Sequence, residues 1–168
     1  MGKKVGIIGY GRLGRFLVER IEKEPGLSLA FVHDIDEAKL TDFGPGLAVR
    51  NLDEAKQREA DLVVEVVNTD WVLRYAPSVL EFSDLLIASV AAFAHEGLKE
   101  HLDQVARKCK KRYYIPQGGI VGLDGLRTAR DVIDEVRITT TRPPEGFHLR
   151  GEVPFFETIK ILFQGSAR

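Results

Sequence analysis

The sequence predicts an α/β fold, in which a doubly wound parallel sheet is followed by the start of a second, α+β domain. Short apolar runs alternate with amphipathic helical patterns up to about residue 115. The first run leads directly into a glycine-rich segment, Gly9–Gly14. The alternation ends near Pro116, where several glycines follow one another. Strands that alternate with helices favour a parallel sheet covered on both faces, because each crossover is right-handed.

The individual elements follow from hydrophobic spacing along the chain. Continuous apolar runs predict buried strands, and apolar residues three or four positions apart predict helices. On the first predicted helix this spacing places Leu13, Phe16, Leu17 and Ile21 on one apolar face. The predicted strands are Lys4–Ile8, Leu29–Val32, Leu47–Arg50, Leu62–Val67, Leu85–Ala88 and Arg112–Ile115. The predicted helices are Arg12–Lys23, Asp53–Arg58, a helix with apolar residues from Trp71 to Leu80, and Glu96–Lys108.

The first strand, loop and helix together carry a binding motif for a dinucleotide. Gly9, Gly11 and Gly14 form G-x-G-x-x-G, which allows a tight turn, close approach of a pyrophosphate, and close packing of helix and strand. Asp34 follows the second strand, 20 residues after Gly14, where a carboxylate accepts hydrogen bonds from an adenosine ribose. This pattern indicates a Rossmann-type domain and favours NAD over NADP. Arg12, inside the loop, partly offsets that preference, so NADP remains an alternative cofactor.

Composition sets limits on the other classes of function. The chain has 168 residues, a net charge of −1 and one cysteine, Cys109. This charge gives no reason to expect nucleic acid or a membrane as a partner. A single cysteine and four scattered histidines predict neither a disulfide nor a metal site, and a cytoplasmic location is expected. We predict an NAD-binding domain over residues 1–116 and part of a second domain over residues 117–168.

The second region is too small to bury a core of its own. Its apolar spacing predicts a helix from Leu123 to Ile133 and strands at Val136–Thr141 and Thr158–Phe163. Such a partial domain exposes strand edges and apolar surface. We therefore expect the chain to form a homodimer through the strands of this region.

Several segments together resemble the L-aspartate dehydrogenase family. They are the glycine loop with its preceding strand, Val63–Val66, Ser89–Ala94, Pro116–Asp124 and Phe163–Ala167. The resemblance covers essentially the whole chain, and Pro116–Asp124 is its most specific part. Family members are longer and carry their catalytic histidine beyond the segment that matches the end of this chain. The resemblance therefore implies a truncated form, with no catalytic residue among these 168 residues.

The resemblance also implies a set of residues that contact the cofactor. Ala91 and Ala92 suit close approach of a nicotinamide or tight helix packing. Asn68 is equally suited to be the N-cap of the following helix, a role for which Thr69 and Asp70 compete. Tyr75 has the spacing of a core residue. Gly119 stands where the family usually has alanine, so a contact there would use the backbone. The full set is Gly9, Gly11, Arg12, Leu13, Gly14, Asp34, Val67, Asn68, Tyr75, Ala88, Ser89 and Gly119.

The sequence supports more than one hypothesis for the activity. The first is an NAD-dependent dehydrogenase that oxidises L-aspartate to iminosuccinate, with Arg142 as a candidate partner for a substrate carboxylate. The second is a non-catalytic module that binds NAD or a protein partner. The third is another amino- or imino-acid oxidoreductase, because the cofactor domain does not determine the substrate.

Overall fold

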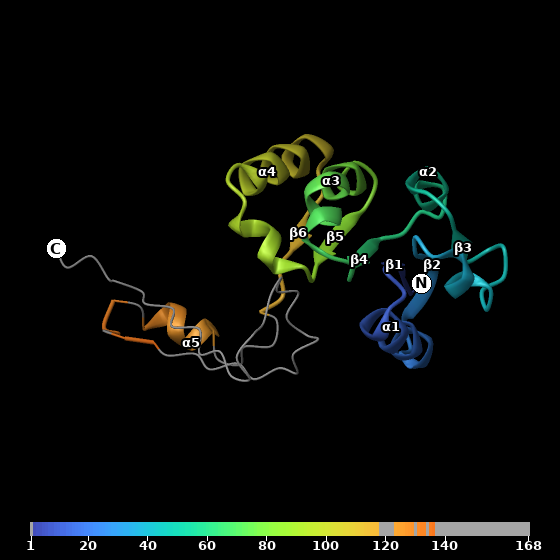
Figure 1. Cartoon of the computed structure of the whole chain (residues 1–168), viewed down its shortest axis with the longest axis horizontal. Coiled ribbons are helices and arrows are strands. Elements are labelled where there is room, and N and C mark those ends of the chain that lie inside the picture. Colours follow the sequence, from blue (N-terminus) through green and yellow to red (C-terminus); the bar gives the residue numbers. More distant parts are fainter. Residues whose placement is uncertain (1, 118–122, 130, 134, 137–168) are drawn as a thin grey trace, which may run out of the picture. The chain divides into compact units, whose positions relative to one another are not determined.

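The computed structural model describes residues 2–117, 123–129, 131–133 and 135–136 (Figure 1). The chain divides into two compact units, Met1–Gly118 and Gly119–Arg168. The strands of the first unit are β1 (Lys3–Ile8), β2 (Leu27–His33), β3 (Ala48–Val49), β4 (Leu62–Glu65), β5 (Asp84–Ile87) and β6 (Tyr113–Tyr114). Its helices are α1 (Arg12–Lys23), η1 (Glu37–Leu40), α2 (Leu52–Lys56), α3 (Thr69–Leu80), η2 (Val90–Ala94) and α4 (Leu98–Cys109).

The six strands form one parallel sheet in the order β3-β2-β1-β4-β5-β6. Strand β1 is central, and the chain moves outward from it first through β2 and β3. It then returns through α2 to the other side of β1 and continues through β4, β5 and β6. The predicted doubly wound parallel sheet is therefore confirmed. In such a sheet, ligands bind at the carboxyl ends of the strands where the winding direction reverses, which here is beside β1.

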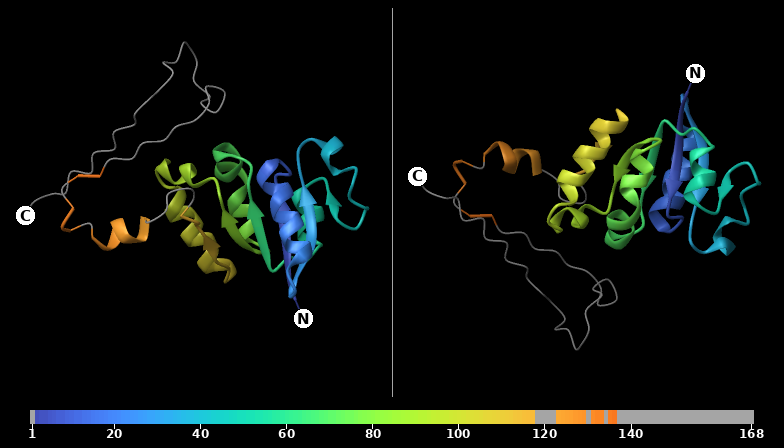
Figure 2. Two further views of the ribbon diagram at one scale, coloured as in Figure 1. Left: turned by 90° about the horizontal axis from the view of Figure 1, so that it is seen from below. Right: turned by 90° about the horizontal axis from the view of Figure 1, so that it is seen from above.

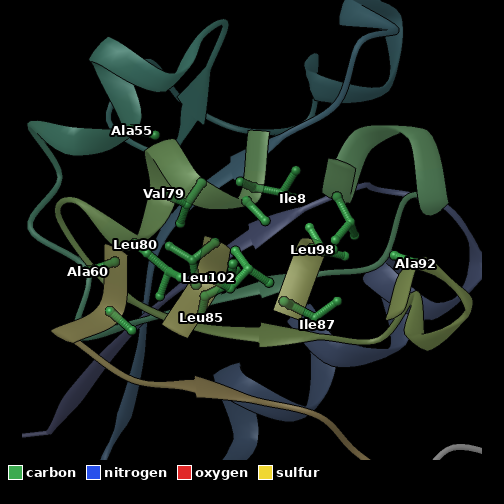
Figure 3. Close-up of a cluster of buried hydrophobic side chains, with 14 of the residues drawn as sticks. Ile8, Ala55, Ala60, Val79, Leu80, Leu85, Ile87, Ala92, Leu98 and Leu102 are labelled. Carbon is green, nitrogen blue, oxygen red and sulfur yellow. The ribbon is translucent and has the colours of Figure 1, made fainter. Parts of the chain in front are cut away.

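Helices pack on both faces of this sheet, and successive strand residues alternate between them (Figure 2). Ile8, Phe31 and Val63 face a core shared with α2, α3 and α4 (Figure 3). Their neighbours Ile7, Val32 and Val64 face the opposite core, shared with α1 and η1. Because both faces are buried, the strands read as continuous apolar runs in the sequence.

The central strand has one unusually close contact. The register between β1 and β2 shifts between Val5 and Gly6, so that Val5 pairs with Leu29 and Gly6 with Phe31. A Cβ atom on Gly6 would overlap the ring of Phe31, which is fully buried. The aromatic ring therefore occupies the space that a side chain at position 6 would need.

The structure corrects the predicted apolar face of α1. Leu13 and Phe16 are 50% and 56% exposed, whereas Gly14, Val18 and Ile21 are buried. Gly14 must face the sheet because the helix begins immediately beside β1, and this rotates the two large side chains outward. The 3-10 helices η1 and η2 were not predicted, since four or five residues are too few to show a hydrophobic period.

The ends of several elements also differ from the prediction by one or two residues. Strand β4 ends at Glu65 instead of Val67, because the Val67 N–H donates to the Glu65 carboxylate rather than to a neighbouring strand. Helix α4 begins at Leu98 instead of Glu96, after Gly97 in a left-handed conformation. The structure places β5 at Asp84–Ile87, so Ala88 follows the strand. Shifts of this size are usual at element ends.

The second unit is described over a short part of its length. Helix α5 (Leu123–Thr128) lies within the predicted helix that begins at Leu123. Residues 137–168, which include the predicted strand Thr158–Phe163 and all of the predicted strand Val136–Thr141 except Val136, lie outside the described residues. Among the residues described in either unit, no helix is long and apolar enough to cross a membrane.

Candidate dinucleotide-binding site

The glycine loop joins β1 to α1, and its three motif glycines differ in what a side chain at each position would meet. Gly9 has a φ of +100°, and a Cβ there would lie 2.7 Å from the Val66 carbonyl oxygen. A Cβ on Gly14 would overlap the carbonyl oxygen of Gly9, so this glycine lets α1 approach the loop. A Cβ on Gly11 would meet no atom within 4 Å. The first and third glycines thus shape the loop, and the middle one borders open space.

This open space lies at the start of α1. Gly11 is the N-cap of the helix, and no side chain caps the backbone there. The first turn, which begins with Arg12 and Leu13, contains no acidic residue. N–H groups at a helix start lack partners within the helix, and the helix dipole adds partial positive charge. The exposed glycine and the uncapped helix start therefore fit a pyrophosphate.

Asp34 lies directly after β2 and is 8% exposed. Its Oδ2 accepts a hydrogen bond from the Tyr10 N–H at 2.7 Å. Its Oδ1 accepts from the Asp36 N–H at 2.9 Å and from Lys39 Nζ at 3.1 Å. Asp34 therefore fastens the end of β2 to the glycine loop, in addition to its predicted contact with a ribose.

The charge on Asp34 is well stabilised. Burial acts to raise the pKa of this carboxyl, but the hydrogen bonds from the Asp36 and Tyr10 N–H groups and from Lys39 outweigh it. The pKa of Asp34 is consequently below its ordinary value of 3.8. The neighbouring Lys39 ammonium is 36% exposed and partly balances this negative charge. A 2′-phosphate would thus meet a cation as well as a carboxylate at this end of the site.

On the other side of β1, the ends of β4 and β5 bring four predicted site residues to the same edge of the sheet. Val67 is 40% exposed, and a Cβ on Gly9 would lie 3.0 Å from its Cγ2 atom. Asn68 is exposed and is the N-cap of α3, because its Oδ1 accepts from the Trp71 N–H at 2.9 Å. Ala88 and Ser89 follow β5 and are partly exposed. The predicted N-cap role of Asn68 is confirmed, and its exposure leaves it accessible to a ligand.

One buried charged residue at this edge was not singled out from the sequence. The Glu65 side chain, at the end of β4, is fully buried. Its Oε1 accepts from the Val67 N–H and the Ser89 Oγ–H, both at 2.7 Å, and its Oε2 accepts from the Ser89 N–H at 3.1 Å. Glu65 thereby connects the two loops that follow β4 and β5. Val63–Val66 reads as an apolar run interrupted by one acid, and this interruption was the only signal in the sequence.

Other predicted site residues are less closely connected to the open space at Gly11 and to the strand ends beside it. Tyr75 is partly buried on α3, and its ring contacts are with Trp71, at 5.6 Å between ring centroids, and Arg74. Ala92 is fully buried, as the packing interpretation of this residue predicts. Gly119 and Arg142 lie outside the described residues.

Two further features lie near the adenosine side of the sheet. Ile35 directly follows Asp34 and is 96% exposed, so it offers an apolar side chain beside the predicted ribose position. A cavity of about 470 Å³ lies beyond β3 and is lined by Glu37, Leu40, Thr41, Phe43, Pro45, Ala48, Arg50 and Glu54. That lining contains none of the glycine-loop residues, so the cavity is separate from the open space at Gly11.

The chain matches one family model and several related proteins. Residues 9–116 match the family model of the homoserine dehydrogenase NAD binding domain. The L-aspartate dehydrogenase of Archaeoglobus fulgidus is 34% identical over 166 residues, which cover 97% of this chain and 63% of that protein. An aspartate dehydrogenase domain-containing protein of Danio rerio is also 34% identical, with the same coverage of both chains. The chain thus spans about three fifths of the length of these relatives.

Solved structures show the same fold. An aspartate dehydrogenase from Thermotoga maritima aligns with a TM-score of 0.63 and 24% identity, over 90% of this chain and 61% of that one. An engineered D-amino acid dehydrogenase bound to NADP+ aligns with a TM-score of 0.64 and 16% identity, over 80% of this chain and 43% of that one.

Proposed function

The chain belongs to the L-aspartate dehydrogenase family and contains a homoserine dehydrogenase-type NAD binding domain, and from this we propose that it binds NAD and oxidises L-aspartate. The observation that carries the proposal is the open space at Gly11, at the uncapped start of α1. A buried carboxylate, Asp34, flanks this point on the β2 side. The accessible residues Asn68 and Ser89 flank it on the side of β4 and β5.

In this proposal the residues bind and orient the cofactor. The first N–H groups of α1, from Arg12 onward, hold the pyrophosphate, and the open space at Gly11 allows it to approach. Asp34 accepts hydrogen bonds from the adenosine ribose, with Ile35 beside the adenine. The remaining proposed contacts, at the nicotinamide end, are Val67, Asn68, Tyr75, Ala88, Ser89 and Gly119.

When bound, NAD supplies the acceptor for a hydride from the Cα of aspartate. Aspartate and NAD+ thereby give iminosuccinate, NADH and a proton, and the imine hydrolyses to oxaloacetate and ammonium. We assign no catalytic residue within the described part of the chain. The cofactor domain contributes position and electrostatics to the reaction, whereas the substrate contacts belong to the second domain.

NADP is a second cofactor that the site accommodates. The Lys39 ammonium lies 3.1 Å from Asp34 Oδ1 and 4.0 Å from Asp36 Oδ2, so it can turn to a 2′-phosphate without leaving the site. Since Asp34 retains its two backbone donors, this exchange need not disturb the glycine loop. We propose that NAD is preferred and that NADP also binds.

Calorimetric titration with NAD tests the binding proposal. The key variant is Gly11→Ala, because its methyl group would fill the open space while touching no protein atom. We expect wild type to bind NAD and Gly11→Ala to bind at least about 100-fold more weakly, with the fold retained by circular dichroism. Gly44→Ala is the matched control, since a Cβ there also meets no atom within 4 Å. Absence of binding by wild type, or equal binding by Gly11→Ala, would contradict the proposal.

A turnover assay separates the candidate activities. Loss of NADH absorbance in the presence of oxaloacetate and ammonium would support aspartate dehydrogenase activity by the chain. NAD binding without turnover would instead support the non-catalytic module. The third hypothesis predicts turnover with another 2-oxo acid in place of oxaloacetate, so the assay includes a panel of these acids.

We further propose a homodimer in the cytoplasm. The strands expected to form the interface, in the region after residue 117, lie outside the described residues apart from Val136. Within the described residues, the edge strand β6 carries Tyr114, 44% exposed, and Ile115 follows it at 46% exposed, so these two side chains offer an apolar strip for a second copy. Cys109 is a free, half-buried thiol, which suits a reducing compartment. Static light scattering of the full chain should give twice the monomer mass, and a monomer mass would contradict the dimer.

A further inference from the structure

The buried carboxylate of Glu65 has an unusual set of partners. A buried charge is normally compensated by an opposite charge or a metal, because its loss of hydration is costly. Within the described part of the chain, Glu65 is instead held by three neutral donors: the Val67 N–H, the Ser89 N–H and the Ser89 hydroxyl. Both carboxylate oxygens accept at least one backbone N–H, so each acts as an acceptor.

These bonds fix the hydrogen-bonding role of Ser89. A serine hydroxyl has one proton to donate and two lone pairs with which to accept. The Ser89 proton is committed to Glu65 Oε1, at 2.7 Å between the oxygens. Serine is a favoured N-cap, yet Ser89 precedes η2 without capping it through its side chain. The free lone pairs of Ser89 Oγ can therefore only accept, and Ser89 is partly exposed while Glu65 is sealed.

The position of this pair in the sheet indicates which part of a ligand it meets. Asp34 follows β2, on one side of the central strand β1. On the other side, Glu65 is the last residue of β4 and Ser89 follows β5. A dinucleotide lies across the carboxyl ends of the strands with its pyrophosphate at the β1 loop. If the adenosine lies towards Asp34, the nicotinamide lies towards Ser89. This step rests on the function proposed above.

We propose that Glu65 is a positioning residue that fixes Ser89 Oγ as an acceptor for the carboxamide NH₂ of the nicotinamide. The amide carries two N–H donors, and an acceptor of fixed direction holds the ring in one orientation relative to the substrate. The carboxylate itself does not contact the cofactor, because it is fully buried. The alternative is that Glu65 only fastens the two loops together, in which case ligands with and without the amide are affected equally.

Binding of three ligands to the full chain distinguishes these alternatives. NAD has the amide, 3-acetylpyridine adenine dinucleotide has a methyl ketone in its place, and ADP-ribose lacks the ring. We expect wild type to prefer NAD over the ketone analogue by about tenfold, the value of one hydrogen bond to a well-placed acceptor. In Ser89→Ala we expect this preference to fall to less than about twofold, with the affinity for ADP-ribose unchanged.

Ser83→Ala is the matched control beside the same strand. Ser83 is buried just before β5, where the carbonyl oxygens of Ala60 and Asp84 lie 3.0 and 2.9 Å from its Oγ and either can accept its one proton. This variant also loses a serine hydroxyl, but at the end of β5 that lies away from Ser89. It should keep the wild-type preference for NAD.

Glu65→Gln tests the positioning role directly. A glutamine whose carbonyl oxygen takes the place of Oε1 keeps the Val67 N–H and the Ser89 hydroxyl, but its NH₂ group then faces the Ser89 N–H, donor against donor. The backbone at Ser89 must shift to avoid this, so Ser89 Oγ loses its fixed direction. We expect the preference for NAD to disappear while ADP-ribose still binds. If Glu65→Gln does not fold, Ser89→Ala still tests the proposed contact with the carboxamide. Ser89→Ala leaves the buried Glu65 carboxylate with its two N–H donors.

Each outcome gives a clear answer. Wild-type discrimination in Ser89→Ala, or equal loss of all three ligands, would overturn the positioning role. A wild-type chain that binds NAD, its analogue and ADP-ribose with the same affinity would also overturn it, while the dinucleotide proposal would stand. A wild-type chain that binds none of the three would refute both.

Discussion

Replacement of Asp34 by alanine should destabilise the protein even without a cofactor. The carboxylate connects β2 to the glycine loop through the N–H groups of Tyr10 and Asp36, and it is only 8% exposed. In Asp34→Ala both N–H groups lose a charged acceptor. Lys39 also loses its partner, but this side chain is 36% exposed and can be hydrated instead.

The size of the effect follows from these contacts. Hydrogen bonds to charged groups contribute about 1.5–3 kcal/mol each, so two of them give about 3–6 kcal/mol. Water that enters beside the shortened side chain recovers part of this, and the Lys39 pair adds little because exposed ion pairs are weak. We expect the free energy of unfolding to fall by about 3 kcal/mol near neutral pH, which is a large part of the stability of a typical domain.

The dependence on pH provides an internal check. The pKa of Asp34 lies below its ordinary value of 3.8 in the folded state, because its hydrogen bonds outweigh burial. A group whose pKa is lowered on folding stabilises the protein above its unfolded pKa, and this contribution is lost as pH falls through the folded pKa. The difference between wild type and Asp34→Ala should therefore shrink as the pH falls below 3.8 towards the lowered pKa of the folded state.

Urea unfolding followed by circular dichroism measures both effects. Asp36→Ala is the control, because this neighbouring carboxylate is 53% exposed and caps η1 through the Ala38 N–H at 3.2 Å. Its loss should cost less than about 1 kcal/mol. A change below about 1 kcal/mol in Asp34→Ala, or a difference that does not shrink as acid is added below pH 3.8, would refute the role assigned to Asp34.

Two further predictions concern α3 and α4. Asn68→Ala removes the cap of α3 and should lower the free energy of unfolding by about 1 kcal/mol, whereas Asn68→Ser should restore most of it; equal stability of the two variants would contradict the capping role. Burial and the Asp103 carboxylate, which accepts from the Tyr113 hydroxyl at 2.5 Å, raise the pKa of Tyr113 to about 12. In Asp103→Asn, ultraviolet titration should show Tyr113 ionising at lower pH, and an unchanged titration would show that burial alone sets the value.

Much of the fold could be predicted because its signals are local. The sheet strands are apolar on both faces, so each appears as a continuous run, and the glycine loop is defined by three residues within six positions. Right-handed crossovers then favour the doubly wound sheet, whereas the order of its six strands comes from the structure. The N-cap Asn68 was also predictable, since capping depends on a contact three residues along the chain.

The features that were missed depend on contacts between distant segments. Glu65 is paired with Ser89, 24 residues later, and no spacing rule connects an acid in one strand with a serine after the next. The outward position of Leu13 and Phe16 results from the need of Gly14 to face the sheet, and hydrophobic spacing alone favours the opposite arrangement. The partner of Asp34, Lys39, lies on a 3-10 helix that has no signature in the sequence.

The contact between Gly6 and Phe31 limits which amino-acid substitutions this sheet can accept during evolution. The ring of Phe31 fills the volume above position 6, so a larger residue at one of these two positions leaves less room for the residue at the other. Enlarging position 6 would displace the ring into a packed layer, and shrinking position 31 would leave a void over bare backbone. Viable exchanges at these positions should therefore occur in pairs, with a larger residue in β1 accompanying a smaller one in β2.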